Sequence, residues 1–190
     1  MDGDADSDGR AAAIARAVFL DRDGVINRVV MRLGRPESPR AMSEFAFEPG
    51  VAAAVERLKA AGLRLFVVSN QPDLARGKLA PETVAAMTGA IMRALPIDAV
   101  RVCPHDDRDD CGCRKPRPGM LVELAREYGV VLGDSFMIGD SWKDMAAGRA
   151  AGCATIMLER DYNCGAAADY RRPTLADAAA LIVSIMDGGR

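Results

Sequence analysis

The sequence predicts an α/β fold, with helices covering both faces of a Rossmann-like parallel sheet. Short apolar runs alternate with longer segments whose apolar residues recur at helical spacing, which is typical of such sheets. The chain has 190 residues, of which 49% are hydrophobic, so it can bury a core without disulfides.

Five short apolar runs are predicted to be the strands, because their length and their Val, Ile and Phe content favour buried strands over helices. In chain order they are Ala17–Leu20, Leu63–Val68, Ala99–Val102, Phe136–Ile138 and Ala154–Leu158. Each strand is followed by a segment with helical spacing, and two of these segments begin with Pro, which is favoured in a first helical turn. The predicted helices are Gly50–Ala61, Pro81–Ala94, Pro118–Tyr128, Trp142–Ala151 and Leu175–Met186.

Two stretches fall outside this pattern. Residues 1–15 are rich in small and acidic side chains that bury too little surface to offset ordering entropy, so we expect a disordered tail. Residues 28–47 lack a hydrophobic period and contain Gly34, Pro36 and Pro39, so we expect a surface loop. Residues 16–190 are expected to form one domain, in which the spacing between motifs leaves no room for a large cap domain.

Charge and hydropathy exclude several classes of protein. A formal net charge of −2 argues against a general binder of nucleic acid or anionic membranes, either of which needs a broad cationic surface. No apolar run approaches the ~20 residues that span a bilayer, and the first residues lack a signal-peptide pattern. We therefore expect a cytoplasmic protein that binds neither nucleic acid nor membranes.

Polar side chains follow three of the predicted strands, and ligands of parallel sheets bind beyond such strand ends. The first strand leads into Asp21 and Asp23, with Gly24 permitting a sharp turn. Asp21 could attack a phosphorus atom, while Asp23 protonates the leaving alkoxide and later activates water. Taken alone, such a motif would more often be a capping Asp followed by a turn, and the other motifs are what favour the catalytic interpretation.

The other strand ends and a basic loop supply the remaining groups of a phosphoryl-transfer site. Ser69, Asn70 and Gln71 offer donors for phosphoryl oxygens, although alone they could form a cap or turn. Lys115 precedes a predicted helix, where cations and free amides favour anions, and a solvated basic loop is the simpler alternative. Asp140 is a candidate Mg²⁺ ligand, while Asp144 either binds the ion through water, orients Lys115 or is a first-turn acid.

In this order, the motifs Asp21-x-Asp23-Gly24, Ser69, Lys115 and Gly139-Asp140-x-x-x-Asp144 resemble the haloacid dehalogenase superfamily. The resemblance implies a phosphatase that works through an aspartyl-phosphate. It also implies Mg²⁺ held by Asp21, Asp140 and the backbone carbonyl of Asp23.

Within that superfamily, residues 21–27, 69–77 and 113–120 resemble the subgroup that removes the C7 phosphate of D-glycero-D-manno-heptose 1,7-bisphosphate. That likeness implies a monomer acting on a small phosphorylated sugar. By that likeness Ser69 and Lys115 would steady the phosphoryl group, and Arg114 would contact the second phosphate. Asn70, Gln71 and Lys143 would line the pocket, and Arg76 is a further candidate contact. The stretch 28–40 and the pair Pro72-Asp73 depart from the subgroup's pattern, which leaves the sugar open.

Three other functions compete with this assignment. Histidinol-phosphate phosphatase is a relative with a zinc loop similar to the one that residues 103–113 predict here, but the segments 75–77 and 118–120 look more like the heptose enzymes. A polynucleotide phosphatase would need a basic stripe with interleaved aromatic residues, which the sequence lacks. A zinc-stabilised binding module without activity would be expected to lack at least one of four site residues, and all four are present: Asp21, Asp23, Lys115 and Asp140.

A cysteine-rich segment at residues 103–113 predicts a zinc loop. Cys103, His105, Cys111 and Cys113 give three thiolates and one imidazole, a soft tetrahedral set suited to structural Zn²⁺, and the resemblance includes such a site. Reduced cysteines near a surface histidine are the alternative, which accounts poorly for two paired spacings in eleven residues. A saturated zinc would hold the adjacent basic loop in place rather than activate water.

Overall fold

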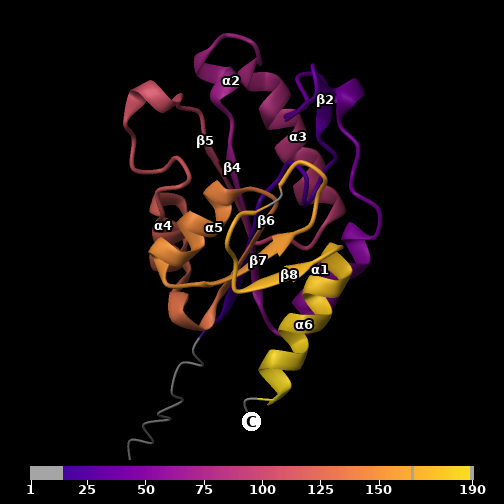
Figure 1. The fold of residues 1–190 in the computed structure, drawn as a ribbon, viewed down its shortest axis with the longest axis vertical. Coiled ribbons are helices and arrows are strands. Elements are labelled where there is room, and N and C mark those ends of the chain that lie inside the picture. The colour runs from indigo at the N-terminus through magenta and orange to yellow at the C-terminus, as the bar shows by residue number, and fades with distance from the viewer. Residues whose placement is uncertain (1–14, 164, 189–190) are drawn as a thin grey trace, which may run out of the picture.

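The protein is built on one six-stranded sheet in which every neighbouring pair is parallel. The computed structural model describes residues 15–163 and 165–188. The strand order is β5-β4-β1-β6-β7-β8 (Figure 1). The strands are β1 (Ala17–Leu20), β4 (Arg64–Asn70), β5 (Ala99–Cys103), β6 (Phe136–Gly139), β7 (Ala154–Leu158) and β8 (Tyr170–Arg172).

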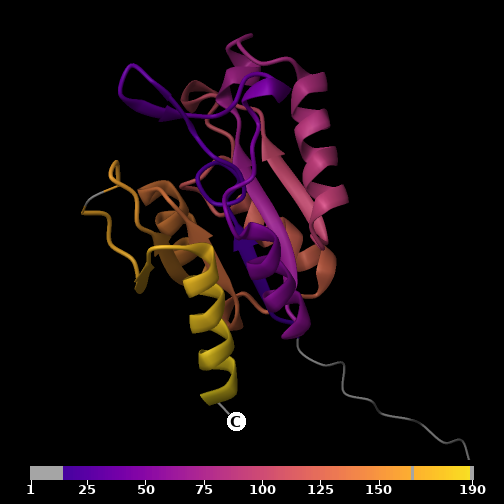
Figure 2. The ribbon, with the colours of Figure 1, turned by 90° about the vertical axis from the view of Figure 1, so that its right-hand side faces the viewer.

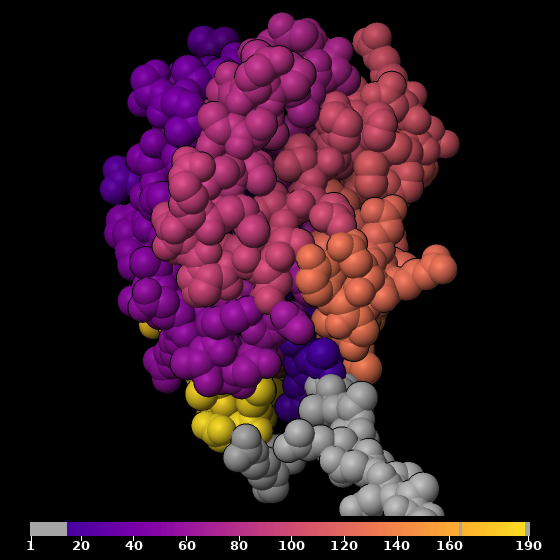
Figure 3. All heavy atoms as spheres, turned by 180° about the vertical axis from the view of Figure 1, so that it is seen from behind, coloured from indigo at the N-terminus to yellow at the C-terminus, as the bar shows by residue number. Residues whose placement is uncertain are grey.

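Helices cover both faces of the sheet, as predicted. Successive residues of β1 alternate between the two cores: Val18 packs with α1 and α6, while Phe19 packs with α4. Figure 2 shows α6 alongside α1, and residues of the magenta part of the chain, which includes α3, cover much of the surface in Figure 3. The helices are α1 (Val51–Ala60), α3 (Pro81–Ala94), α4 (Gly119–Tyr128), α5 (Trp142–Ala151) and α6 (Leu175–Gly188).

The helices form because their apolar residues recur on one side. In α4 the buried residues are Met120, Leu121, Leu124 and Ala125, which lie on one stripe of the helix. The α5 helix begins with a capping box, in which Ser141 and Asp144 satisfy each other's backbone amides. The predicted α/β architecture is therefore confirmed, with element ends shifted by two residues at most.

The prediction of a loop at residues 28–47 was wrong in one respect. This segment contains an antiparallel hairpin of β2 (Val30–Arg32) and β3 (Arg35–Glu37), followed by a 3-10 turn at Met42–Glu44. Leu33 and Gly34 at the hairpin tip both have positive φ, which is the requirement of a two-residue type I′ turn. The strands are too short to show alternation, so periodicity could not reveal them.

Other short elements were also missed. The sequence did not predict β8, α2 (Pro72–Ala75) or the 3-10 turns at Asp107–Asp109 and Leu132–Asp134. The strand β4 also runs on through Asn70, so its polar end belongs to the sheet. The tail expected at residues 1–15 lies outside the described residues except for Ala15, which forms a bridge with Val130.

None of the helices in residues 15–163 and 165–188 combines the length and the apolar character needed to cross a bilayer.

Candidate active site

A cavity of about 520 Å³ opens at the carboxyl ends of β4, β1 and β6, where the sequence placed the site. The β2–β3 hairpin and α2 lie at the same end of the sheet (Figure 1). Ser69 is fully buried and contacts the wall through Gln71. The other predicted catalytic and substrate-binding residues all line the cavity: Asp21, Asp23, Asn70, Gln71, Arg76, Arg114, Lys115, Asp140 and Lys143.

Lys115 is the centre of a buried ion-pair network. Its Nζ atom donates to Asp21 Oδ1 at 2.7 Å and to the Val68 carbonyl at 2.8 Å, and it lies 2.6 Å from Asp144 Oδ1. The side chain of Asn70 exchanges hydrogen bonds with the backbone N–H and C=O of Lys115. Burial disfavours a charged Lys115, but the Asp144 and Asp21 carboxylates outweigh it and raise the pKa. Lys115 therefore stays cationic next to Asp21.

Asp144 takes one of the roles that the sequence left open, because it orients Lys115. Its Oδ1 atom faces Lys115, and its Oδ2 accepts from the Ser141 backbone N–H at 3.0 Å and from Ser141 Oγ at 2.5 Å. Its side chain is only 1% exposed. Both carboxylate oxygens are thus engaged by protein groups.

Three buried acids, Asp144 among them, form a donor set that fits a divalent cation. Carboxylate oxygens of Asp21, Asp140 and Asp144 lie within 4.8 Å of one another. Burial and then the Asp144 charge raise the pKa of Asp21 well above its usual range, and the same two causes raise that of Asp140 to about 7. A hard cation with oxygen ligands would relieve this repulsion. Since Asp144 is committed to Lys115, Asp21 and Asp140 are the carboxylates that would hold Mg²⁺.

Asp23 is fixed by donors on both carboxylate oxygens. Its Oδ1 accepts from Asn27 Nδ2 at 2.9 Å and from the fully buried Arg22. Its Oδ2 accepts from Gln71 Nε2 at 2.7 Å and from Ser38 Oγ at 2.8 Å. Ser38 follows the missed hairpin, so sequence reasoning offered no signal for it. Residues of that segment line the cavity, which makes the hairpin part of the site.

Gly24 permits a close approach between the first motif and Asp140. Its φ is +83°, and a Cβ atom there would lie 2.0 Å from Asp140 Oδ2 and 2.9 Å from the Tyr162 hydroxyl. Tyr162 donates to Asp140 Oδ2 at 2.5 Å, and Asn163 Nδ2 donates to the Asp140 carbonyl at 2.9 Å. Neither Tyr162 nor Asn163 belongs to a sequence pattern that marked it as functional.

Three predicted substrate contacts form a basic wall beside the zinc loop. Arg114 Nε donates to Asp107 at 2.8 Å, and Arg76 makes two bonds with Asp106 at 2.8 and 2.6 Å. Asp107 belongs to the 3-10 turn of the loop and Asp106 caps that turn, so the loop orients both guanidinium groups. Lys143 Nζ lies 5.9 Å from the centre of the Trp142 ring, which also lines the cavity.

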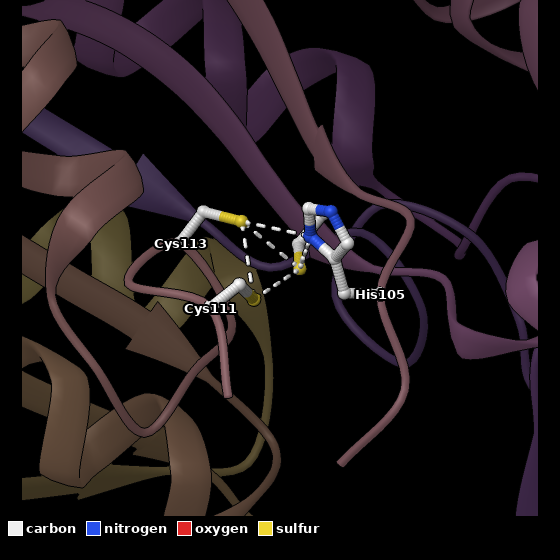
Figure 4. Close-up of side chains that lie close together, drawn as sticks. His105, Cys111 and Cys113 are labelled. Atoms are coloured by element: carbon white, nitrogen blue, oxygen red, sulfur yellow. Dashed lines mark hydrogen bonds between the residues drawn. The ribbon is translucent and has the colours of Figure 1, made fainter. Parts of the chain in front are cut away.

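The predicted zinc ligands converge on one point, and Figure 4 shows His105, Cys111 and Cys113 turned toward one another. Cys113 Sγ lies 3.2 Å from Cys103 Sγ, 3.4 Å from Cys111 Sγ and 3.4 Å from His105 Nδ1. A tetrahedron with Zn–S bonds of ~2.3 Å has edges of ~3.8 Å, so the cluster fits Zn²⁺ with little adjustment. Cys153 is buried in the core and is not one of the residues of this cluster, and Cys164 lies outside the described residues.

Comparisons with known proteins agree with this geometry. The family model of the haloacid dehalogenase-like hydrolases matches residues 40–152. A D-glycero-beta-D-manno-heptose-1,7-bisphosphate 7-phosphatase of Rhodopseudomonas palustris is 41% identical over 155 residues, which cover 75% of this chain and 83% of the relative. The protein of that name from Bordetella bronchiseptica is 36% identical over 149 residues, or 76% and 80% of the two chains.

Two solved structures share the fold. The D,D-heptose 1,7-bisphosphate phosphatase of B. bronchiseptica, crystallised with magnesium and phosphate, superposes with a TM-score of 0.72 at 30% identity. The match covers 90% of this chain and 99% of that one. A phosphatase-like protein from Mesorhizobium loti gives a TM-score of 0.75 at 30% identity, over 90% and 88% of the two chains. The chain therefore belongs to the haloacid dehalogenase-like hydrolases and is a phosphatase that hydrolyses phosphoric monoesters.

Proposed function

We propose that this phosphatase uses Mg²⁺ to remove the C7 phosphate of D-glycero-D-manno-heptose 1,7-bisphosphate. The observation that carries the proposal is the placement of Asp21, Lys115 and Asp140 in one cavity with the cations Arg76 and Arg114. A bisphosphate needs a reacting-phosphate site and a second anion site in the same pocket. The names of the relatives support a heptose as the sugar.

In the first step, an Asp21 carboxylate oxygen attacks the phosphorus atom of the C7 phosphate. The bond between phosphorus and the C7 oxygen breaks, and Asp23 gives its proton to that oxygen. Lys115 stays charged against the phosphoryl oxygens, and Ser69, whose Oγ accepts from Gln71 at 2.8 Å, donates to one of them. The products are the heptose 1-phosphate and an aspartyl-phosphate.

In the second step, Asp23 acts as a base. Its carboxylate takes a proton from water, the water oxygen bonds to phosphorus, and the bond to Asp21 breaks. Inorganic phosphate leaves, and both acids return to their starting states. Mg²⁺, held by Asp21, Asp140 and the Asp23 carbonyl, would supply charge neutralisation between the nucleophile and the phosphoryl group.

The second phosphate is assigned to the basic wall. Arg114 would bind it, with Arg76 and Lys143 at its sides, while Asn70 and Gln71 would face the sugar. Zn²⁺ on Cys103, His105, Cys111 and Cys113 would stiffen the loop whose Asp106 and Asp107 orient these arginines. We propose that one domain without a large cap, acting as a cytoplasmic monomer, carries all of these groups.

The test is phosphate release with Mg²⁺ from both anomers of heptose 1,7-bisphosphate, fructose 1,6-bisphosphate and histidinol phosphate. Asp21→Asn is the blank, and Asp187→Asn, an exposed helical position, is the matched control. We expect anomer-selective turnover that disappears only in Asp21→Asn. Preference for histidinol phosphate, or equal turnover of all substrates, would contradict the heptose assignment while leaving the phosphatase chemistry intact.

A further inference from the structure

The turn formed by residues 160–163 touches both segments that the proposed cation site depends on. Arg160 Nη2 donates to the Gly24 carbonyl at 2.7 Å, next to Asp23. Tyr162 donates to Asp140 Oδ2 at 2.5 Å, and Asn163 donates to the Asp140 carbonyl at 2.9 Å. Three residues of one turn thus join the end of β1 to the end of β6.

The turn is itself held in shape by local hydrogen bonds. The Arg160 backbone N–H donates to Asn163 Oδ1 at 3.1 Å, and the Asn163 N–H donates to the Arg160 carbonyl at 3.1 Å. Asn163 Nδ2 also donates to the Leu158 carbonyl at 2.6 Å, at the end of β7. The Tyr162 hydroxyl is therefore presented from a braced turn, and its position is set before any ligand arrives.

We propose that Tyr162 is a positioning residue for the divalent cation, in that its hydroxyl fixes one oxygen of Asp140 so that this carboxylate is oriented for metal binding. A carboxylate that binds a metal is held by hydrogen bonds from outer partners, whose loss typically weakens metal affinity 10- to 100-fold. The contact is enclosed, since Gly24 leaves no room for a Cβ atom between Asp140 and Tyr162. Asp140 is 7% exposed, so the Tyr162 hydroxyl is a donor that bulk water replaces poorly.

The geometry also admits an opposite effect. If the Tyr162 hydroxyl competed with the cation for Asp140, removing it would tighten binding. The two ideas predict changes of opposite sign in one measurement. The inference rests on the proposed magnesium-dependent function, so the wild-type protein must be measured in the same series.

The experiment is a titration of the full chain with MgCl₂ after dialysis into magnesium-free buffer without chelator, so that the zinc loop stays loaded. Binding is followed by calorimetry and by the fluorescence of Trp142, which is the only tryptophan and lines the same cavity. Tyr162→Phe removes one oxygen atom and keeps the ring. Tyr170→Phe, on the edge strand β8, is the matched control.

We expect Tyr162→Phe to raise the Mg²⁺ dissociation constant by about tenfold, with Tyr170→Phe unchanged. The Mg²⁺ concentration for half-maximal activity should rise by the same factor, while KM for the sugar phosphate at saturating Mg²⁺ stays within about twofold. An unchanged or tighter dissociation constant in Tyr162→Phe would overturn the inference. A wild-type chain that neither binds Mg²⁺ nor needs it would overturn the proposed cofactor, and the inference with it.

Discussion

Replacing Lys115 with Met tests whether this cation holds the acidic cluster together. The side chain is 3% exposed and its Nζ atom has three partners, Asp21, Asp144 and the Val68 carbonyl. Methionine retains most of the buried stem, so packing changes little. The main effect is to leave two buried carboxylates without their cation.

The expected loss of stability follows from that arrangement. Removing one partner of a buried ion pair typically costs about 3–5 kcal/mol. The two pairs share one cation and their contributions do not add, so we expect the single-pair range rather than twice it. Lys59→Met is the matched control, because Lys59 is 37% exposed and Asp98 keeps its bond from Arg64. An exposed pair of this kind contributes less than about 1 kcal/mol.

The assay is equilibrium unfolding in urea at neutral pH without Mg²⁺, with the slope m compared between variants. Saturating Mg²⁺ should restore part of the loss in Lys115→Met, since a cation again lies among the carboxylates. Phosphatase activity should fall at least about 100-fold, as when one donor to the reacting group is removed. The reasoning is refuted if Lys115→Met is destabilised no more than Lys59→Met.

Three further outcomes are expected. Ser38→Ala removes one of the donors to Asp23 Oδ2 and should lower kcat about 3- to 10-fold, as expected for the loss of one hydrogen bond of about 1 kcal/mol. Ser38→Thr keeps the hydroxyl and should recover the activity. Equal kcat values for all three proteins in steady-state kinetics would contradict this role. Cys113→Ser should reduce the zinc content measured by mass spectrometry and lower the melting temperature, whereas Cys153→Ser, which is outside the metal-binding group, should keep full zinc. Burial raises the pKa of Asp140 to about 7 in the folded state, against about 3.9 unfolded, so the folded magnesium-free protein binds more protons in that window. Its stability should therefore fall as pH rises from about 4 to about 7, and a urea series in which Asp140→Asn shows the same pH slope would rule out this cause.

Local sequence was sufficient for five of the six strands of the sheet and for the main acids of the site. Strands such as Ala17–Leu20 are short and apolar because both of their faces are buried, and that pattern survives in the sequence. Asp21 and Asp140 were predicted because parallel strands bring their carboxyl ends together. A polar residue that directly follows a buried apolar strand is therefore expected at that edge of the sheet. The cluster of Cys103, His105, Cys111 and Cys113 was predicted because its spacing within one loop is typical of a structural metal site.

The hairpin and the turn at residues 160–163 could not be found in this way. The strands β2 and β3 have three residues each, which is too few to show a period. Ser38 and Asp23 are 15 positions apart, and Tyr162 and Asp140 are 22 apart, so neither contact is implied by local spacing. The two departures from the family pattern meet in space, where Arg40 Nε donates to Asp73 Oδ2 at 2.6 Å and joins the hairpin segment to α2.

The sequence by itself determined which kinds of group meet at the site, because their order along the strand ends supplies carboxylates, a cation and a cysteine-histidine cluster. Only the tertiary structure decided how those groups are held. It pairs Asp144 with Lys115 and Ser141, and it brings Ser38 and Tyr162 onto the carboxylates of Asp23 and Asp140. The physical reason is that hydrogen bonds between residues far apart in the chain depend on how the sheet, hairpin and turn pack, and local residue patterns do not encode that packing.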